Sequence, residues 1–303
     1  MRKLLLVSIL ILLQMAAYPQ NGWRSERHGF ALGLGGNIFM GDLGGGNKNN
    51  NHIFAFGDVD PNFLKFSGML SYSYRLSERL SMRLGVLYSE VGADDANSKS
   101  ESRRKRNLNF KSQLIDMGIN LDYYFVREKV FSRYESASFA SKWAAYFTVG
   151  LGGLHYNPKG KYEGQWYDLQ PLCTEGQGTG VRFVAHDTHT VTQAGQKYSL
   201  MAVSIPIGLG VKFQLSGDMS VGIEIAQRFT TTDYIDDCSA YYFNYDEMGI
   251  EPPSEATRYF AYKSIGSAEG IPSTGSPRGN SGYNDSYFTG MITFCYKFLR
   301  GKD

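Results

Sequence analysis

The sequence predicts an all-β fold, an eight-stranded antiparallel barrel that crosses a membrane with its strands. Three observations predict this fold class. Eight segments alternate apolar and polar residues with a period of two, which is typical of strands with one apolar face. The 303 residues include 35 Gly, 21 Tyr and 19 Phe, a composition that suits strands and polar loops better than helices. Long and short connections alternate between the segments, as they do in outer-membrane barrels.

The N-terminal residues 1–20 are predicted to be a secretory signal peptide, which leaves residues 21–303 as one barrel domain. Arg2 and Lys3 provide a basic start, and residues 4–13 form an apolar run that small residues follow. This run is shorter than the roughly 20 apolar residues that a membrane-spanning helix needs. No later stretch is long and apolar enough either, so the mature chain is expected to enter a membrane through strands alone.

Three strands are predicted in the first third of the chain, at residues 30–39, 65–76 and 80–89. One face of each strand carries aliphatic and aromatic residues, and the other carries mostly Gly, Ser or Arg. Only residues 77–79 separate the second strand from the third, which predicts a tight hairpin. After residue 90 the alternation gives way to a stretch rich in Asp, Ser, Lys and Arg, which predicts a solvated loop.

Five more strands are predicted at residues 115–125, 143–156, 199–215, 221–228 and 286–298. Residues 216–218 form a Gly/Asp turn, so the third and fourth of these strands make a hairpin. Pro206 lies inside the longest strand. Because proline has no N–H to donate to a ladder, we expect a β-bulge there.

Lipid is expected to contact the apolar faces, and the polar faces then line the lumen. Each apolar face covers about five alternating positions, which matches the 9 to 11 residues that a tilted strand needs to cross a bilayer. An eight-stranded barrel has an interior barely wide enough for side chains, so charged residues need partners there. We therefore expect a plug of ion pairs rather than a pore, formed by Arg83, Asp116, Asp122, Lys212, Glu224 and Arg228.

The connection lengths also predict location and orientation. An even number of strands places both termini on the side of the short turns, which is the periplasmic side of outer-membrane barrels, and the long loops outside the cell. The predicted location is therefore the cell outer membrane, with outer-membrane lipid around the strands. The formal net charge is +2, so no overall field predicts binding to nucleic acid.

No residue pattern predicts an active site, a metal site or a cofactor. His186 and His189 lack a third ligand that the sequence could place. The carboxylates from Asp233 to Glu247 lack the spacing of a calcium-binding loop, so loop acidity is the favoured interpretation. The basic run at residues 103–106 is interpreted as a charged loop surface, with binding to anionic sugars or lipids as the alternative. An enzyme with its residues at the barrel rim stays a weak alternative.

Five ordered blocks of sequence resemble one family. They are residues 37–43 (NIFMGDL), 106–112 (RNLNFKS), the group 155–159, 166–172 and 174–178 (HYNPK, WYDLQPL, TEGQG), 205–213 (IPIGLGVKF) and 230–237 (TTTDYIDD). Together they resemble the PorG-like outer-membrane β-barrels of Bacteroidetes, which are associated with the type IX secretion system. The motif residues are Gly41, Asp42, Glu175, Gly176, Asp233, Tyr234, Asp236 and Asp237.

The resemblance implies a non-enzymatic barrel, without cofactors, that ties a periplasmic ring to the outer membrane. That ring is built from a lipoprotein and its partner protein. The contact would use the periplasmic side, where residues 127–142 offer the largest surface, and an inert turn is an equally open alternative. The candidate contacts are Arg127, Lys129, Phe131, Arg133 and Tyr134. The second hypothesis is a small barrel that binds a surface ligand or adhesion partner through its long outer loops.

Three cysteines in an exported chain leave at least one thiol without an internal partner. Cys173 and Cys238 lie in the two largest outer loops and depart from the pattern of the family that the chain resembles. One hypothesis is therefore a disulfide between Cys173 and Cys238 in an oxidising compartment, with Cys295 unpaired in a strand. Three free cysteines are the alternative.

Overall fold

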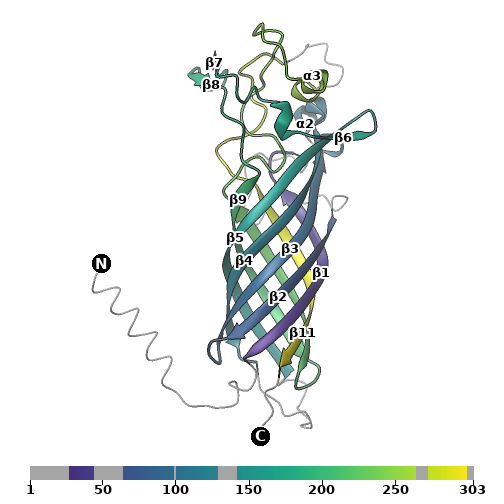
Figure 1. Cartoon of the computed structure of the whole chain (residues 1–303), viewed down its shortest axis with the longest axis vertical. Helices are drawn as coiled ribbons and strands as arrows, with labels where there is room; N and C mark the ends of the chain where they lie inside the picture. Colours follow the sequence, from purple (N-terminus) through teal and green to yellow (C-terminus); the bar gives the residue numbers. More distant parts are fainter. Residues whose placement is uncertain (1–26, 44–63, 99, 129–141, 264–271, 299–303) are drawn as a thin grey trace, which may run out of the picture.

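The computed structural model describes residues 27–43, 64–98, 100–128, 142–263 and 272–298. Eight antiparallel strands form one closed sheet in the order β4-β3-β2-β1-β11-β10-β9-β5, and the pairing of β4 with β5 closes it into a barrel (Figure 1). The strands are β1 (His28–Met40), β2 (Lys65–Arg75), β3 (Leu80–Asp94), β4 (Asn109–Val126), β5 (Trp143–Tyr162), β9 (Met201–Gln214), β10 (Met219–Thr230) and β11 (Ser286–Phe298). The predicted eight-stranded barrel is confirmed.

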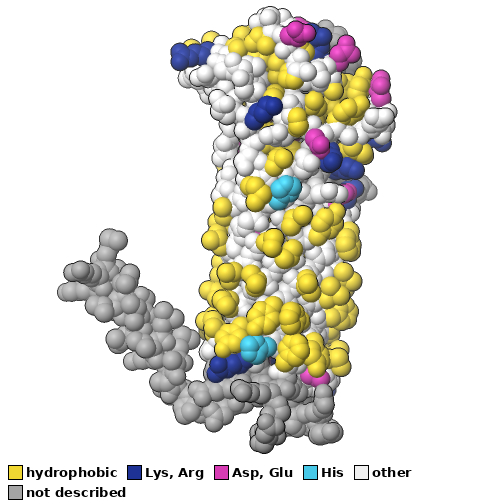
Figure 2. Space-filling model, in the orientation of Figure 1, with side chains coloured by type: hydrophobic (Ala, Val, Ile, Leu, Met, Phe, Trp, Pro, Cys, Tyr) yellow, Lys and Arg dark blue, Asp and Glu magenta, His cyan; other side chains and the backbone are white. Residues whose placement is uncertain are grey.

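The apolar faces of the strands point outward, as predicted from the alternation. Leu32 and Leu34 on β1 are about half exposed, at 50% and 44%, while Asn37 on the same strand is buried inside. Figure 2 shows apolar side chains as a broad band on the face of the barrel that it presents. On β4 the band runs from Phe125 to Ile115, which spans roughly 25 Å at about 3.3 Å per residue and a tilt of about 40°. This is the height of the apolar band expected of a transmembrane barrel.

Three neighbouring strands are longer than the alternation predicted. β3 continues to Asp94, β4 begins at Asn109, and β5 continues to Tyr162. The prediction ended these strands where the outward apolar residues end. Beyond that level on β4, outward Gln113 is polar and inward Leu114 is fully buried. The strands therefore project past the apolar band with their polarity reversed, polar outside and apolar inside.

Short elements fill the regions that the sequence predicted as loops. Between β3 and β4 lie η3 (Asp95–Asn97) and α2 (Glu101–Arg106), and the basic run forms the last turn of α2, where cations stabilise a helix C-terminus. Between β5 and β9 lie β6 (Gln165–Asp168), η5 (Gln170–Leu172), β7 (Arg182–Val184) and β8 (Val191–Gln193), and α3 (Glu255–Ala261) lies between β10 and β11. All of these elements gather at one end of the barrel (Figure 1), which we call the loop end. The opposite end, with the short connections 76–79 and 215–218, is the turn end.

An apolar core closes the barrel interior toward the loop end. Its members come from the upper parts of the strands and from the loops: Phe39, Leu43, Met69, Leu87, Val91, Ala93, Leu108, Phe110, Leu114, Leu154, Tyr156, Leu169, Tyr198, Ile235, Cys238, Phe260, Tyr287 and Met291. Burial of such side chains contributes about 1.5–3 kcal/mol each. The loop end is therefore packed like a soluble protein, although it sits on a membrane barrel.

The bulge predicted at Pro206 is absent, which corrects that expectation. Pro206 pairs in register with Arg228 of β10. On the β5 side the pairing is interrupted at Ile205 and Pro206, yet the register is the same before and after the interruption. The missing N–H therefore faces β5 and removes a ladder bond without inserting a residue. The described residues show a register shift elsewhere, between Tyr124 and Val126 of β4.

Among the described residues, no helix has the length and apolar character to cross a membrane.

Candidate functional site

The lumen brings together charged residues from opposite walls of the barrel. Arg83 of β3 forms an ion pair with Glu224 of β10 (Nη1 to Oε2, 2.7 Å) and donates to Asp122 of β4 (Nη2 to Oδ1, 3.2 Å). Tyr146 of β5 donates to the same Glu224 oxygen at 2.6 Å. All four side chains are buried, so each charge in this group has a partner that offsets its desolvation.

A second group of lumenal charges lies around Asp116. Its Oδ2 accepts from Arg228 Nη1 at 2.8 Å and from the Tyr287 hydroxyl at 2.9 Å. Its Oδ1 accepts from Ser204 Oγ at 2.7 Å. Five of the six residues expected to plug the lumen thus form two ion-paired groups. Lys212, the sixth, donates to the Tyr124 hydroxyl at 2.8 Å instead of pairing with a carboxylate.

The motif residues of the family resemblance meet at the loop end. Glu175, from the connection between β5 and β9, accepts from the backbone N–H of Ser239 at 2.9 Å, from Arg278 Nη1 at 3.0 Å, and from Tyr234 at 3.4 Å. Asp237 accepts from the hydroxyls of Thr174 and Tyr198, both at 2.6 Å. We call this largely buried assembly the loop-end junction and include in it Asp42, Arg106, Glu175, Asp233, Tyr234, Asp236, Asp237, Arg278 and Asp285.

Two arginines hold the junction together, Arg278 buried and Arg106 largely so. Arg278 donates to Glu175 and to the backbone oxygen of Asp237 at 2.5 Å. Arg106, at the end of α2, binds both carboxylate oxygens of Asp95 at 2.7 and 3.0 Å, and also the backbone oxygens of Asp42 and Arg278 at 2.7 and 2.6 Å. A planar guanidinium suits such several-fold contacts because its donors have fixed directions. Segments from all four loop connections are therefore linked at one place.

Two motif glycines occupy positions where a side chain would clash. A Cβ on Gly41 would overlap the Phe39 ring and the Asp285 carboxylate. Gly176 has a φ of +73°, and a Cβ there would overlap the Phe243 ring. Glycine accepts such backbone conformations and close approaches without strain. These two motif residues therefore permit the close packing of the junction rather than contribute contacts to it.

The aspartates of the junction lie close together, and burial raises the pKa of four of them. Burial, and then the neighbouring carboxyl of Asp236, raise the pKa of Asp233 to about 10. Burial also raises the pKa of Asp236 and Asp285 well above the ordinary range, with Asp42 adding to the effect at Asp236. The pKa of Asp237 is raised only to about 6, because Arg278 and two hydroxyl donors oppose the effect of its burial.

Several junction residues have no sequence signal that assigns them to a site. Arg278 and Asp285 stand in a loop without any local pattern, so nothing in the sequence singles them out. Arg106 belongs to one motif block and to the basic run, which was interpreted as a charged surface. The structure corrects that interpretation for Arg106, whereas Arg104 and Lys105 are exposed.

The docking candidates are described only in part. Arg127 is exposed at the turn end and forms an ion pair with Glu78 at 2.8 Å. Lys129, Phe131, Arg133 and Tyr134 lie outside the described residues.

The disulfide hypothesis is not met, because all three cysteines are free. Cys173 Sγ donates to the backbone oxygen of Pro171 at 3.5 Å, and Cys238 Sγ donates to that of Arg278 at 3.3 Å. Each buried thiol therefore has its own local acceptor, as the alternative of three free cysteines requires. Within the described ranges, no group of three or more His, Cys, Asp or Glu residues is placed to hold a metal ion.

A closed barrel with an apolar band, a lumen filled by ion pairs and an elaborate loop end defines a small integral barrel of the outer-membrane class. The chain belongs to the family of the outer membrane protein beta-barrel domain, whose model matches residues 4–248. No curated protein matches the chain.

Solved structures of other small barrels are similar to this one in fold. Neisserial surface protein A has a TM-score of 0.38 and 9% identity, over 89% of this chain and 97% of that one. A major outer membrane protein from Thermus thermophilus has a TM-score of 0.37 and 8% identity, over 89% and 99%. The attachment invasion locus protein Ail of Yersinia pestis, in complex with the heparin analogue sucrose octasulfate, has a TM-score of 0.36 and 8% identity, over 90% and 99%.

Proposed function

We propose that this chain is a non-enzymatic anchoring barrel of the type IX secretion system. The observation that carries the proposal is the loop-end junction. Asp42, Glu175 and Asp237 come from three separate motif blocks of the resemblance, and buried hydrogen bonds and ion pairs link them through Arg106 and Arg278. Motif residues that serve one shared structure support a resemblance of the whole loop end rather than chance matches in single blocks.

The lumen supports an anchoring role over transport through the barrel. Most of its charged residues are paired with one another, and an apolar core covers them toward the loop end. In this proposal the turn end and both termini face the periplasm, and the outer surface of the strands contacts outer-membrane lipid. The partners are the periplasmic ring lipoprotein and its partner protein, which would contact Arg127 and the following residues up to 142.

A pull-down from outer membranes in mild detergent tests this function. The tagged chain is expected to recover the ring lipoprotein and its partner protein, identified by mass spectrometry. Replacing residues 129–141 by a short Gly/Ser turn should abolish that recovery while the barrel still assembles. The control replaces residues 182–193, the β7–β8 hairpin at the loop end, and should leave recovery unchanged. Recovery of the barrel alone, from cells that secrete by this route, would contradict the proposal.

The second candidate is a barrel that binds a surface ligand or adhesion partner through its loops. The favouring observation is a separate apolar cluster in the long connections, formed by Ala194, Phe243 and Tyr245. It gives these loops a fixed shape well beyond the apolar band. Deletion of the gene separates the two candidates, since normal secretion together with lost adhesion would favour the second.

A further inference from the structure

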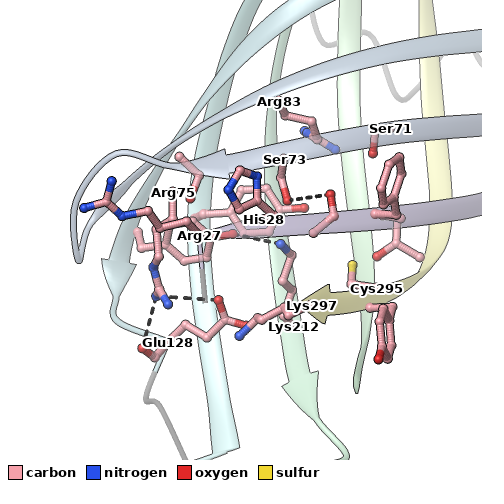
Figure 3. A pocket seen from close by; sticks show the side chains of 18 residues that line it. Arg27, His28, Ser71, Ser73, Arg75, Arg83, Glu128, Lys212, Cys295 and Lys297 are labelled. Atoms are coloured by element: carbon pink, nitrogen blue, oxygen red, sulfur yellow. Dashed lines mark hydrogen bonds and ion pairs between the residues drawn. The ribbon is translucent and has the colours of Figure 1, made fainter. Parts of the chain in front are cut away.

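The lumen contains a cavity near the turn end that the ion-paired groups leave open. It has about 40 Å³ of space for the centres of water molecules and is lined by β1, β2, β3, β4, β5, β9 and β11. One water needs roughly 10–15 Å³ in this measure. The cavity therefore has room for a few heavy atoms. Figure 3 shows Arg75, Lys212, Lys297 and Cys295 around it.

One cation of this cavity lies apart from the carboxylate that the lining provides. Glu128 is that carboxylate among the described lining residues, and it forms ion pairs with Lys297 (Nζ, 2.7 Å) and Arg75 (Nη2, 3.6 Å). Lys212 is the cation without such a pair. Its Nζ binds the Tyr124 hydroxyl and lies 5.4 and 5.1 Å from the ring centres of Tyr124 and Tyr146, without a carboxylate in ion-pair distance among the described residues.

Three buried donors of the lining have no hydrogen-bond partner within the part of the chain that the structure describes. They are Ser71 Oγ, Thr293 Oγ1 and Arg83 Nε, in residues that are 3%, 2% and 6% exposed. The remaining nitrogens of Arg83 are occupied by Asp122 and Glu224. A buried polar group without a partner destabilises the fold, because it has lost its hydrogen bonds to water. Each of these three groups can donate a hydrogen bond, and none of them is satisfied by the ion pairs already described.

We propose that this cavity binds a small oxyanion, a carboxylate or phosphate group that enters from the turn end. Such a group accepts several hydrogen bonds at once and carries a negative charge that can pair with the Lys212 ammonium. Water would satisfy the three donors, but it would leave Lys212 without an anion in ion-pair distance among the described residues. The cavity lies in the lumen and shares Glu128 with the start of the proposed docking segment, but the proposal does not depend on docking.

Cys295 provides a reporter because it lines the cavity, while Cys173 and Cys238 are buried at the loop end. The full-length chain, folded in detergent, is labelled with one of two methanethiosulfonates of similar size. One carries a sulfonate and the other a trimethylammonium group, and peptide mass spectrometry follows Cys295. Each rate is divided by the rate at which the same reagent labels a small free thiol. The anionic reagent is expected to give a ratio about tenfold higher, since the charge of Lys212 concentrates anions in the cavity. Equal ratios, or a higher ratio for the cationic reagent, would overturn the proposal.

Protection by anions tests binding itself. Inorganic phosphate should slow the labelling of Cys295 in a saturable manner, and chloride at the same ionic strength should not. Protection by phosphate but not by acetate assigns a divalent oxyanion, and protection by both assigns oxyanions in general. Protection by neither, beyond the effect of chloride, would overturn the proposal.

Variants locate the protection in the cavity. Lys212→Met should weaken phosphate protection at least tenfold, whereas Lys111→Met, whose ammonium lies over Trp166 at the loop end, should leave it unchanged. Heat-modifiable migration on gels checks that each barrel has folded. Thr293→Val, which removes one unpartnered donor and keeps the side-chain shape, is the second variant if Lys212→Met does not fold. Unchanged protection in the cavity variant that folds would contradict the assignment.

Discussion

At the scale of single residues, two arginines do most to shape the loop end. Arg106 and Arg278 each contact segments that are far apart in the sequence, and neighbouring anions raise the pKa of both despite their burial. They therefore stay charged throughout the physiological range. The carboxylates that they face depend on them, because a buried charge without its partner is strongly destabilising.

Arg278→Met should open the loop end without unfolding the barrel. It leaves Glu175 and Asp237 buried without their cation, at a cost of about 3–5 kcal/mol. Native-state proteolysis of the loops measures the free energy of this local opening. Arg258→Met is the control, because Arg258 forms an exposed ion pair with Asp246 that contributes about 1 kcal/mol or less. Similar effects of the two variants would contradict this account of the junction.

The loop end should become less stable as the pH rises. Asp233 has a folded pKa of about 10 against an ordinary value of 3.8, and the pKa values of Asp236 and Asp285 shift in the same direction. The folded form thus binds more protons than the unfolded form, and stability falls between these two values. Proteolysis of the loops should be faster at pH 9 than at pH 5, with a smaller difference in Asp233→Asn. Slower proteolysis of the loops at pH 9 than at pH 5 would contradict the predicted direction of the pH dependence.

At the scale of the elements, the strands were predictable where they cross the apolar band and not beyond it. The outward alternation of Leu32 and Leu34 fixes the facing of β1, and similar patterns located all eight strands. Beyond the band the alternation reverses, and the apolar residues Leu114 and Phe110 face inward. The sequence pattern therefore predicted that the strand begins at Ile115, although β4 begins at Asn109. Their inward packing depends on the loop core, which is built from distant segments and has no local signal.

Two arginine substitutions on the outer face test where the band ends. Leu34→Arg places a charge on the lipid side, which should cost about 2–4 kcal/mol near the midplane. Gln113→Arg, on the outward face of β4 above the band, should cost about 0–1 kcal/mol. Urea titration of folding into lipid vesicles measures both. A large loss in the free energy of unfolding of Gln113→Arg would show that the apolar band extends to this level. No loss in Leu34→Arg would show that the inward and outward faces are assigned the wrong way round.

At the scale of the whole molecule, the barrel is a closed wall with two kinds of interior. Polar groups such as Arg83 and Glu224 fill the part within the band, and apolar residues fill the part above it. The lumenal charges were predictable because they lie on one face of each strand. The pairing of Arg83 with Glu224 was not, because that contact needs the closed circumference and the register of every strand between them.

The purified chain should not conduct ions in planar bilayers. The ion-paired groups around Glu224 and Asp116 block the lumen, and the apolar core lies above them. Recordings at low and high salt are expected to show no stable open steps. The variant Arg83→Ser removes the central side chain and is expected to admit at most brief openings. A steady channel in the unmodified chain would contradict a plugged interior.

The loop-end junction also records the order of assembly. Asp42, just after β1, accepts from the backbone N–H of Asn280, which is 238 residues later and just before β11. This bond can form only once the first and last strands have met at the seam of the barrel. Contacts of such sequence separation form late, because the chain between them must first be ordered. Ordered loops therefore indicate that the barrel has closed. A chain released before its last strand has paired would have open, protease-sensitive loops.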